Sequence, residues 1–192
     1  MIAIIKYNAG NTKSVENAVK RLGFDCIITD DPSEIKRANK VIFPGVGEAS
    51  TAMAYLKQHQ LDKLIVSLKQ PVLGICLGLQ LMCKSSEEGN TKCLGIFDTV
   101  VKKFPPIDIV PHMGWNNLLE TSGAMFKGIS QTNDVYFVHS YYAELVKDTV
   151  ATCNYILPFS AAIQKDNFYA TQFHTEKSAQ IGEIILNNFL SL

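Results

Sequence analysis

The sequence predicts an α/β fold, in which helices flank a central, mostly parallel sheet and an additional antiparallel strand region follows. Over the first 83 residues, short apolar runs alternate with segments of helical periodicity, which is typical of a parallel sheet covered by helices. From about residue 97 onward, strand-like runs follow one another with only turn signals between them. The 192 residues contain no repeat, low-complexity tract or linker, so one domain over residues 1–192 is expected.

In the first half, a local pattern predicts each element. Apolar residues recur at helical spacing from Val15 to Leu22, and Gly23 is a helix stop. Asp31 and Pro32 are typical of an N-cap followed by the first position of a helix. The predicted strands are Ile2–Lys6, Cys26–Thr29, Val41–Phe43 and Val72–Ile75, and two further helices are expected over Ala49–Gln58 and Leu61–Lys69.

In the second half, β-type patterns dominate until a final helix. Turn signals such as Pro105-Pro106 and Asp166-Asn167 separate the runs, and apolar residues share one helical face from Ile181 to Phe189. The predicted strands are Phe97–Lys103, Met113–Leu119, Val135–His139, Val150–Tyr155, Ser160–Gln164 and Phe168–Phe173.

Composition excludes several classes of protein. The 18 Lys and Arg balance the 18 Asp and Glu, and without a basic block a nucleic-acid partner is not expected. The longest uncharged stretch, Thr149–Gln164, is too short and too polar for a membrane helix, and no signal peptide is readable at the start. Five Cys without a CxxC pair argue against a disulfide framework or a zinc ribbon and favour a cytoplasmic location.

The strand around Leu73 leads into Gly74-Ile75-Cys76-Leu77-Gly78, which has the pattern of a nucleophile elbow with Cys in place of Ser. The flanking glycines permit a tight turn from strand to helix, and the sulfur then lies near a helix N-terminus, where the partial positive charge favours the thiolate. The alternative is an ordinary core cysteine, because free Cys is among the most buried residue types.

A cysteine nucleophile needs a base and a group that orients the base. His174 ends a predicted strand, and Glu176 follows two residues later, where an extended chain would point both side chains the same way. The carboxylate would then fix the tautomer of the imidazole, although an inert surface pair is the alternative. The remaining histidines, to which the sequence assigns no role, are His59, His112 and His139.

Acyl chemistry also needs hydrogen-bond donors for the oxyanion. The Pro44–Gly47 loop follows the third strand, beside the elbow strand in a regular order, and its glycines permit inward-turned N–H groups. Leu77, directly after the nucleophile, supplies the second expected donor. An ordinary Gly-rich turn is the alternative for Pro44–Gly47.

Together these motifs resemble the class I glutamine amidotransferases, the family of Cys-His-Glu glutaminases. The resemblance covers nearly the whole chain, and its motifs are Pro44–Gly47, Gly74–Gln80, Ser86–Glu88 and Phe173–Ser178. Three further segments are similar to the members that supply ammonia to a separate cyclase in histidine biosynthesis, namely Tyr7–Asn11, Pro111–Asn116 and Tyr136–Tyr141. The Pro111–Asn116 string separates those members from the other amidotransferases.

The resemblance implies a role at each matching position. Cys76 attacks the side-chain amide of glutamine, His174 transfers the protons and Glu176 orients His174. Gly47 and Leu77 supply the oxyanion contacts. The positions that align with glutamine-binding residues are Gln80, Glu88, Ser140 and Tyr141. The positions that align with the partner interface, where ammonia leaves, are Trp115, Tyr136 and Lys177.

Simpler alternatives remain for several of these positions. Trp115 is the only Trp and could be a core residue, and Tyr136 and Tyr141 could simply pack in an apolar strand region. Lys177 could cap a turn, and Glu88 could lie on a solvated loop. The chain also departs from the family pattern at Thr175, where Pro is usual, so the geometry of the turn between His174 and Glu176 is less constrained. Lys6 and Asn8 replace the usual Asp and Gly at positions outside the triad.

The resemblance therefore implies a glutaminase that forms a thioester, needs no cofactor or metal, and works as a heterodimer with a (β/α)₈-barrel cyclase. Two alternatives stay open. One is an amidotransferase component for another pathway, such as pyridoxal phosphate, anthranilate or aminodeoxychorismate synthesis, against which Pro111–Asn116 argues. The other is a binding module with an inactive triad.

Overall fold

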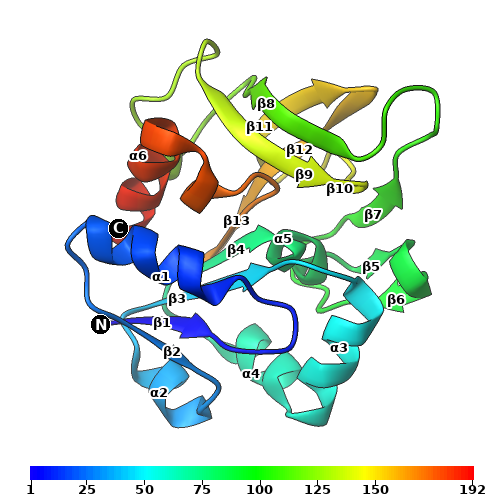
Figure 1. The fold of residues 1–192 in the computed structure, drawn as a ribbon. Helices are drawn as coiled ribbons and strands as arrows, with labels where there is room; N and C mark the ends of the chain where they lie inside the picture. Colours follow the sequence, from blue (N-terminus) through cyan, green and yellow to red (C-terminus); the bar gives the residue numbers. More distant parts are fainter.

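A seven-stranded mixed sheet forms the centre of the computed structural model, which describes residues 1–192 (Figure 1). From edge to edge its strands are β11 (Thr149–Tyr155), β12 (Leu157–Lys165), β13 (Phe168–Thr171), β4 (Val72–Cys76), β3 (Lys40–Gly45), β1 (Ile2–Ile5) and β2 (Cys26–Thr29). The strands from β13 to β2 are parallel, whereas β12 and β11 extend the sheet in antiparallel fashion. The predicted fold class is confirmed.

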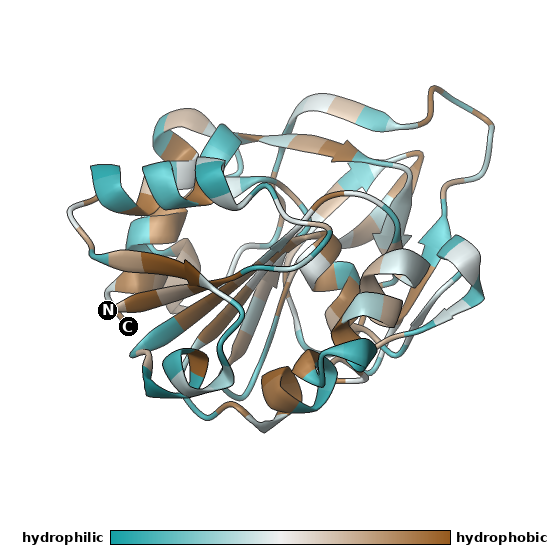
Figure 2. Cartoon of the chain, turned by 60° about the horizontal axis from the view of Figure 1, so that its bottom comes forward, coloured by the Kyte–Doolittle hydropathy of each residue, from teal (hydrophilic) through white to brown (hydrophobic).

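Helices cover both faces of this sheet. One face packs against α2 (Pro32–Arg37), α3 (Ala49–Gln58), α4 (Leu61–Ser67) and α5 (Leu77–Met82), and the other against α1 (Thr12–Arg21) and α6 (Ala179–Leu190). Because side chains alternate along a strand, Ala3 and Ile5 join the first core, while Ile2 and Ile4 join the second. Figure 2 shows these apolar strands between the helical layers.

Two smaller sheets complete the fold. One is a four-stranded sheet, in the order β10 (Tyr141–Ala143), β7 (Val100–Lys103), β5 (Ser85–Ser86) and β6 (Thr91–Lys92). The other is an antiparallel pair, β8 (His112–Asn117) and β9 (Asp134–His139). Three 3₁₀ turns lie between these elements: η1 (Glu88–Asn90), η2 (Ala124–Phe126) and η3 (Thr175–Lys177).

Most local predictions are confirmed, and the exceptions have physical reasons. The Asp31 carboxylate caps α2 by accepting hydrogen bonds from the N–H groups of Ser33 at 2.6 Å and Glu34 at 3.2 Å. The strand expected from Phe97 begins only at Val100, because the Phe97 N–H bonds the last turn of α5 instead. The short strands β5, β6 and β10 were not predicted, since two or three residues are too few to show a periodicity.

All five cysteines are free thiols, as expected from their odd number and spacing. The helix predicted over residues 61–69 ends at Ser67, because Leu68 takes an extended conformation. No helix of the structure has the length and apolar character needed to cross a membrane.

Candidate active site

Cys76 occupies a sharp turn between β4 and α5, the structural context that the elbow pattern predicts. Its backbone has φ 54° and ψ −107°, a region that non-glycine residues rarely occupy. The turn is tight because α5 lies directly against β3. A Cβ atom on Gly78 would come within 2.0 Å of the Phe43 carbonyl oxygen, so only glycine fits at this position.

The sheet order brings the other candidate groups to the same edge. β4 lies between β3 and β13, and the register pairs Gly45 with Cys76 on one side and Thr171 with Ile75 on the other. The Pro44–Gly47 segment is therefore adjacent to the elbow, as predicted, and His174 follows shortly after β13. Gly47 has φ 107°, so it makes the turn that only glycine adopts without strain.

His174 and Glu176 form a buried pair. Nδ1 of His174 lies 2.8 Å from Oε1 of Glu176, and both side chains are 2% exposed. Because a carboxylate only accepts, Nδ1 carries the proton, and Nε2, which is buried without a hydrogen-bond partner, is the ring nitrogen free to act as a base. The alternative of an inert surface pair is wrong.

The local geometry behind this pairing differs from the expected one. His174 and Glu176 do not lie on an extended strand, because the chain turns into η3 directly after His174. Hydrogen bonds hold this turn on both sides: the His174 N–H donates to the Tyr136 carbonyl at 3.0 Å, and the Ser178 hydroxyl donates to the His174 carbonyl at 2.6 Å. Thr175, in place of the usual Pro, is buried within the turn.

The charge state of His174 depends on its neighbours. Burial by itself disfavours the imidazolium, but the interactions with a negatively charged Cys76 sulfur and with Glu176 outweigh it and raise the pKa of His174 to about 10, so His174 retains the proton that it takes from Cys76. The other two buried histidines behave in the opposite way. Burial lowers the pKa of His112 to about 4, and burial, with smaller contributions from His112 and His174, lowers that of His139 to about 3.

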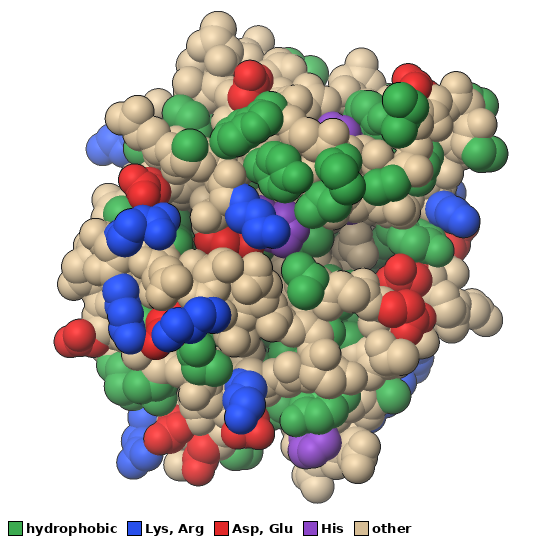
Figure 3. Space-filling model, in the orientation of Figure 1, with side chains coloured by type: hydrophobic (Ala, Val, Ile, Leu, Met, Phe, Trp, Pro, Cys, Tyr) green, Lys and Arg blue, Asp and Glu red, His purple; other side chains and the backbone are tan.

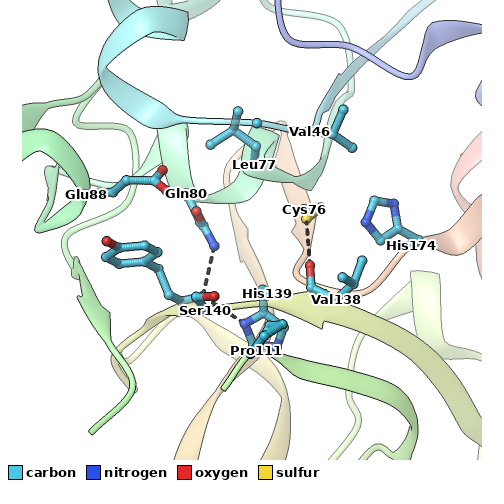
Figure 4. Close-up of a pocket in the computed structure, with 12 residues that line it drawn as sticks. Val46, Cys76, Leu77, Gln80, Glu88, Pro111, Val138, His139, Ser140 and His174 are labelled. Atoms are coloured by element: carbon cyan, nitrogen blue, oxygen red, sulfur yellow. Dashed lines mark hydrogen bonds between the residues drawn. The ribbon is translucent and has the colours of Figure 1, made fainter. Parts of the chain in front are cut away.

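The candidate nucleophile and base open on one pocket of about 330 Å³ (Figure 4). In Figure 4, Cys76 and His174 lie on one side of it, and Gln80, Glu88 and Ser140 on the other. Every residue predicted to be catalytic, oxyanion-binding or glutamine-binding lines the pocket except Glu176, which lies behind His174. The lining residues are Val46, Gly47, Cys76, Leu77, Gln80, Glu88, Pro111, Val138, His139, Ser140, Tyr141 and His174.

The polar end of the pocket is formed by side chains from α5, η1 and the β9–β10 connection. Gln80 donates a hydrogen bond to the Tyr141 carbonyl at 2.9 Å. Glu88 accepts from the Ala49 N–H at 2.7 Å through one oxygen. Burial and the neighbouring Glu48 raise the pKa of Glu88, so a cation beside these two carboxylates would be favoured.

Sequence reasoning missed three residues at this site. His112 and His139 are directly opposite each other in the β8–β9 register, and their rings are 3.1 Å apart between nitrogens. Gln172, fully buried, places its amide nitrogen 3.7 Å from the Cys76 sulfur. The only sequence signal for Gln172 is its position two residues before His174, and the histidine pairing depends on strand register.

The residues predicted to face a partner lie on a different surface of the same region. Trp115 is 54% exposed on β8, so the alternative of a core Trp is wrong. It packs edge-on against Tyr136 of β9, with ring centroids 5.8 Å apart, and Lys177 is exposed on η3. Figure 3 shows hydrophobic side chains gathered over this region beside histidine and lysine. No group of three or more His, Cys, Asp or Glu side chains is arranged to hold a metal.

Comparisons with known proteins agree with this geometry. The family model "Glutamine amidotransferase class-I" matches residues 3–192. "Imidazole glycerol phosphate synthase subunit HisH" of Bacteroides fragilis is 58% identical over 194 residues, covering 100% of this chain and 99% of that protein. The proteins of the same name from Bacteroides thetaiotaomicron and Yersinia pseudotuberculosis are 56% and 44% identical, with the same coverage.

Solved structures show the same fold at low identity. The crystal structure of a glutamine amidotransferase superposes with a TM-score of 0.74 at 18% identity, covering 100% of this chain and 98% of that one. PurLQS from Thermotoga maritima gives a TM-score of 0.74 at 14% identity, covering 99% and 97%. With the family model matched over nearly its whole length, this chain belongs to the class I glutamine amidotransferase family.

Proposed function

We propose that this chain is the glutaminase subunit of an imidazole glycerol phosphate synthase, which hydrolyses glutamine and delivers the ammonia to a (β/α)₈-barrel cyclase in histidine biosynthesis. The observation that carries the proposal is that Cys76 and His174 line one pocket, while the Glu176 carboxylate lies 2.8 Å from Nδ1 of His174. Full-length relatives with the name of that subunit support the choice of pathway over other amidotransferases.

In the first half-reaction, Nε2 of His174 takes the thiol proton of Cys76, and the sulfur attacks the side-chain carbonyl carbon of glutamine. The carbonyl oxygen becomes an oxyanion, for which the N–H groups of Leu77 and Gly47 are the proposed donors. When this intermediate collapses, the C–N bond breaks, the imidazolium gives its proton to the leaving nitrogen, and ammonia departs from a thioester on Cys76.

The second half-reaction uses the same groups. His174 takes a proton from water, the hydroxide attacks the thioester carbonyl, and the C–S bond breaks to release glutamate. The proton on His174 returns to the sulfur. Glu176 keeps the same ring nitrogen protonated throughout and stabilises the imidazolium that forms in both halves.

The polar end of the pocket suits the amino-acid part of the substrate. One carboxylate oxygen of Glu88 is held by the N–H of Ala49, and the other remains available to the α-ammonium group. We assign Gln80, Ser140 and Tyr141 to the remaining polar contacts of glutamine, because all three line the same end.

We assign Trp115, Tyr136 and Lys177 to the cyclase interface and the ammonia exit. The exposed Trp115 supplies the kind of aromatic surface that concentrates binding energy at interfaces. The Tyr136 carbonyl accepts a hydrogen bond from the His174 N–H. A partner bound to β8 and β9 would therefore contact the strand that holds the catalytic turn. The five free thiols fit a cytoplasmic location.

Glutamate release with and without the cyclase tests the proposal, in the wild type and in Cys76→Ala. The wild type should release glutamate when the cyclase and its nucleotide substrate are present, and Cys76→Ala should release none above background. Cys83→Ala is the matched control, because Cys83 is equally buried at the far end of α5 but does not line the pocket. Undiminished turnover by Cys76→Ala would end the proposal.

A further inference from the structure

A continuous chain of hydrogen bonds runs from the Cys76 sulfur into the protein interior. The Gln172 amide nitrogen donates to the sulfur at 3.7 Å, and the Gln172 amide oxygen accepts from the Gln80 nitrogen at 3.0 Å. That same Gln80 nitrogen also donates to the backbone carbonyl of Tyr141 at 2.9 Å. Gln172 is fully buried and follows directly after β13.

Only one orientation of the Gln80 and Gln172 amides satisfies every donor and acceptor in this series of hydrogen bonds. A backbone carbonyl accepts and never donates, so the Gln80 group that faces Tyr141 must be the amide nitrogen. The Gln172 group that faces this nitrogen must then be the oxygen. The Gln172 amide nitrogen is consequently turned to Cys76, and a flip of either amide would bring two like groups together.

The Tyr141 carbonyl, at the end of this series of hydrogen bonds farthest from the sulfur, is held in place by further hydrogen bonds. The Tyr141 carbonyl also accepts from Nδ1 of His139 at 2.8 Å, so Nε2 of this neutral ring accepts from Nδ1 of His112 at 3.1 Å. Asn116 in turn lies 3.3 Å from Nε2 of His112. The carbonyl that fixes the two amides is therefore itself fixed from β8 and β9.

We propose that Gln172 is a further catalytic residue, whose amide N–H stabilises the thiolate of Cys76 during glutamine hydrolysis. The same sulfur also lies 4.0 Å from the Val138 carbonyl, to which the S–H of the thiol donates. When that proton passes to Nε2 of His174, the S–H bond breaks and a full negative charge remains on sulfur. The N–H of Gln172 then becomes a charge-assisted donor, and it weakens again once the C–S bond forms.

This inference rests on the proposed function for its chemistry, but one measurement is independent of turnover. The variant Gln172→Glu keeps an oxygen for Gln80 and loses the donor to sulfur, whereas Gln172→Met loses both. We expect kcat for glutamate release to fall about 10- to 100-fold in each, the effect of one lost hydrogen bond to a charged group. The KM for glutamine should rise only in Gln172→Met, because Gln80 loses its partner there.

The independent measurement is the rate of Cys76 alkylation by iodoacetamide, located by peptide mass spectrometry. It should fall about 10-fold or more in both variants at about pH 7.5, since the thiolate is the reacting form. In Gln172→Glu the rate relative to the wild type should recover as the pH is lowered toward about 5, because the protonated carboxyl regains a donor. The rate in Gln172→Met should not recover, and its fall isolates the lost donor because Met introduces no charge that could repel the thiolate.

Thr171→Val is the matched control. Thr171 is equally buried and is the last residue of β13, directly before Gln172. The substitution removes its 3.0 Å hydrogen bond to the Phe173 carbonyl, but the Thr171 side chain makes no hydrogen bond to the sulfur. Its alkylation rate should stay within about 2-fold of the wild type. Unchanged Cys76 alkylation in folded Gln172→Glu would overturn the inference, whereas a wild type that releases no glutamate with the cyclase would overturn the proposed function alone.

Discussion

The ionisation of His174 is the most informative quantity to perturb, because its neighbours and its burial act in opposite directions. Its pKa rises from 6.5 to about 10, which corresponds to about 5 kcal/mol in favour of the imidazolium. Burial opposes this rise, and of the two neighbours that cause it Cys76 contributes more than Glu176. Cys76→Ala should therefore lower the pKa of His174 further than Glu176→Gln does.

The pH dependence of stability follows from the direction of this change. Because the folded pKa of His174 lies above the unfolded value, its contribution to stability is complete below about pH 6.5 and disappears as the pH rises through about 10. The free energy of unfolding in urea should therefore fall between about pH 7 and about pH 9 in the wild type. The fall should be smaller in Glu176→Gln and smallest in Cys76→Ala.

The two assays are urea unfolding and NMR titration of the ring protons. The chain has only four histidines, and low pKa values of about 4 for His112 and about 3 for His139 separate these two from His174. Glu176→Gln should also reduce kcat by about 10-fold or more, and by up to about 10⁴-fold where the amide nitrogen turns to the ring and selects the wrong tautomer. A wild-type His174 that titrates near 6.5, or identical titrations in both variants, would refute this reasoning.

Three further predictions test separate features. Trp115→Ala should weaken cyclase binding about 30-fold in calorimetry while the free energy of unfolding changes by less than about 0.5 kcal/mol, and a change in stability alone would contradict the interface assignment. Gly78→Ala should cost about 3 kcal/mol or more in urea unfolding, because its Cβ would meet the Phe43 carbonyl at 2.0 Å; a neutral effect would contradict the packing of the elbow. His139→Asn keeps a donor near the Tyr141 carbonyl and should retain the KM for glutamine, whereas His139→Gln should raise it several-fold, and equal values would exclude the hydrogen bond as the cause.

Local patterns predicted the main sheet well because each parallel strand is apolar and bounded by turn or cap residues. They misjudged Phe97, whose apolar side chain is buried in a loop rather than on a strand, because burial and strand pairing are separate requirements. They also missed strands of two or three residues, whose pairing depends on partners far away in the sequence.

The sequence also proposed the pairing of His174 with Glu176, but for an incorrect local reason. The two side chains meet because η3 turns the chain. The His174 N–H donates to the Tyr136 carbonyl and the Ser178 hydroxyl donates to the His174 carbonyl, and these bonds hold that turn. Ser178 is only four residues from His174, but Tyr136 lies roughly forty residues away from both, so no periodicity near His174 encodes the contact of this turn with β9.

What the sequence determined by itself is the chemistry available: a cysteine between two glycines after an apolar strand, a His with a Glu two residues on, and a glycine-rich loop beside them. What only the tertiary structure decided is how these groups and their supports meet. The exposure of Trp115, the His112–His139 pair and the contact of Gln172 with Cys76 depend on strand register and side-chain packing between distant segments. Long-range contacts of this kind are set by the whole fold, because each residue's local sequence is compatible with many partners.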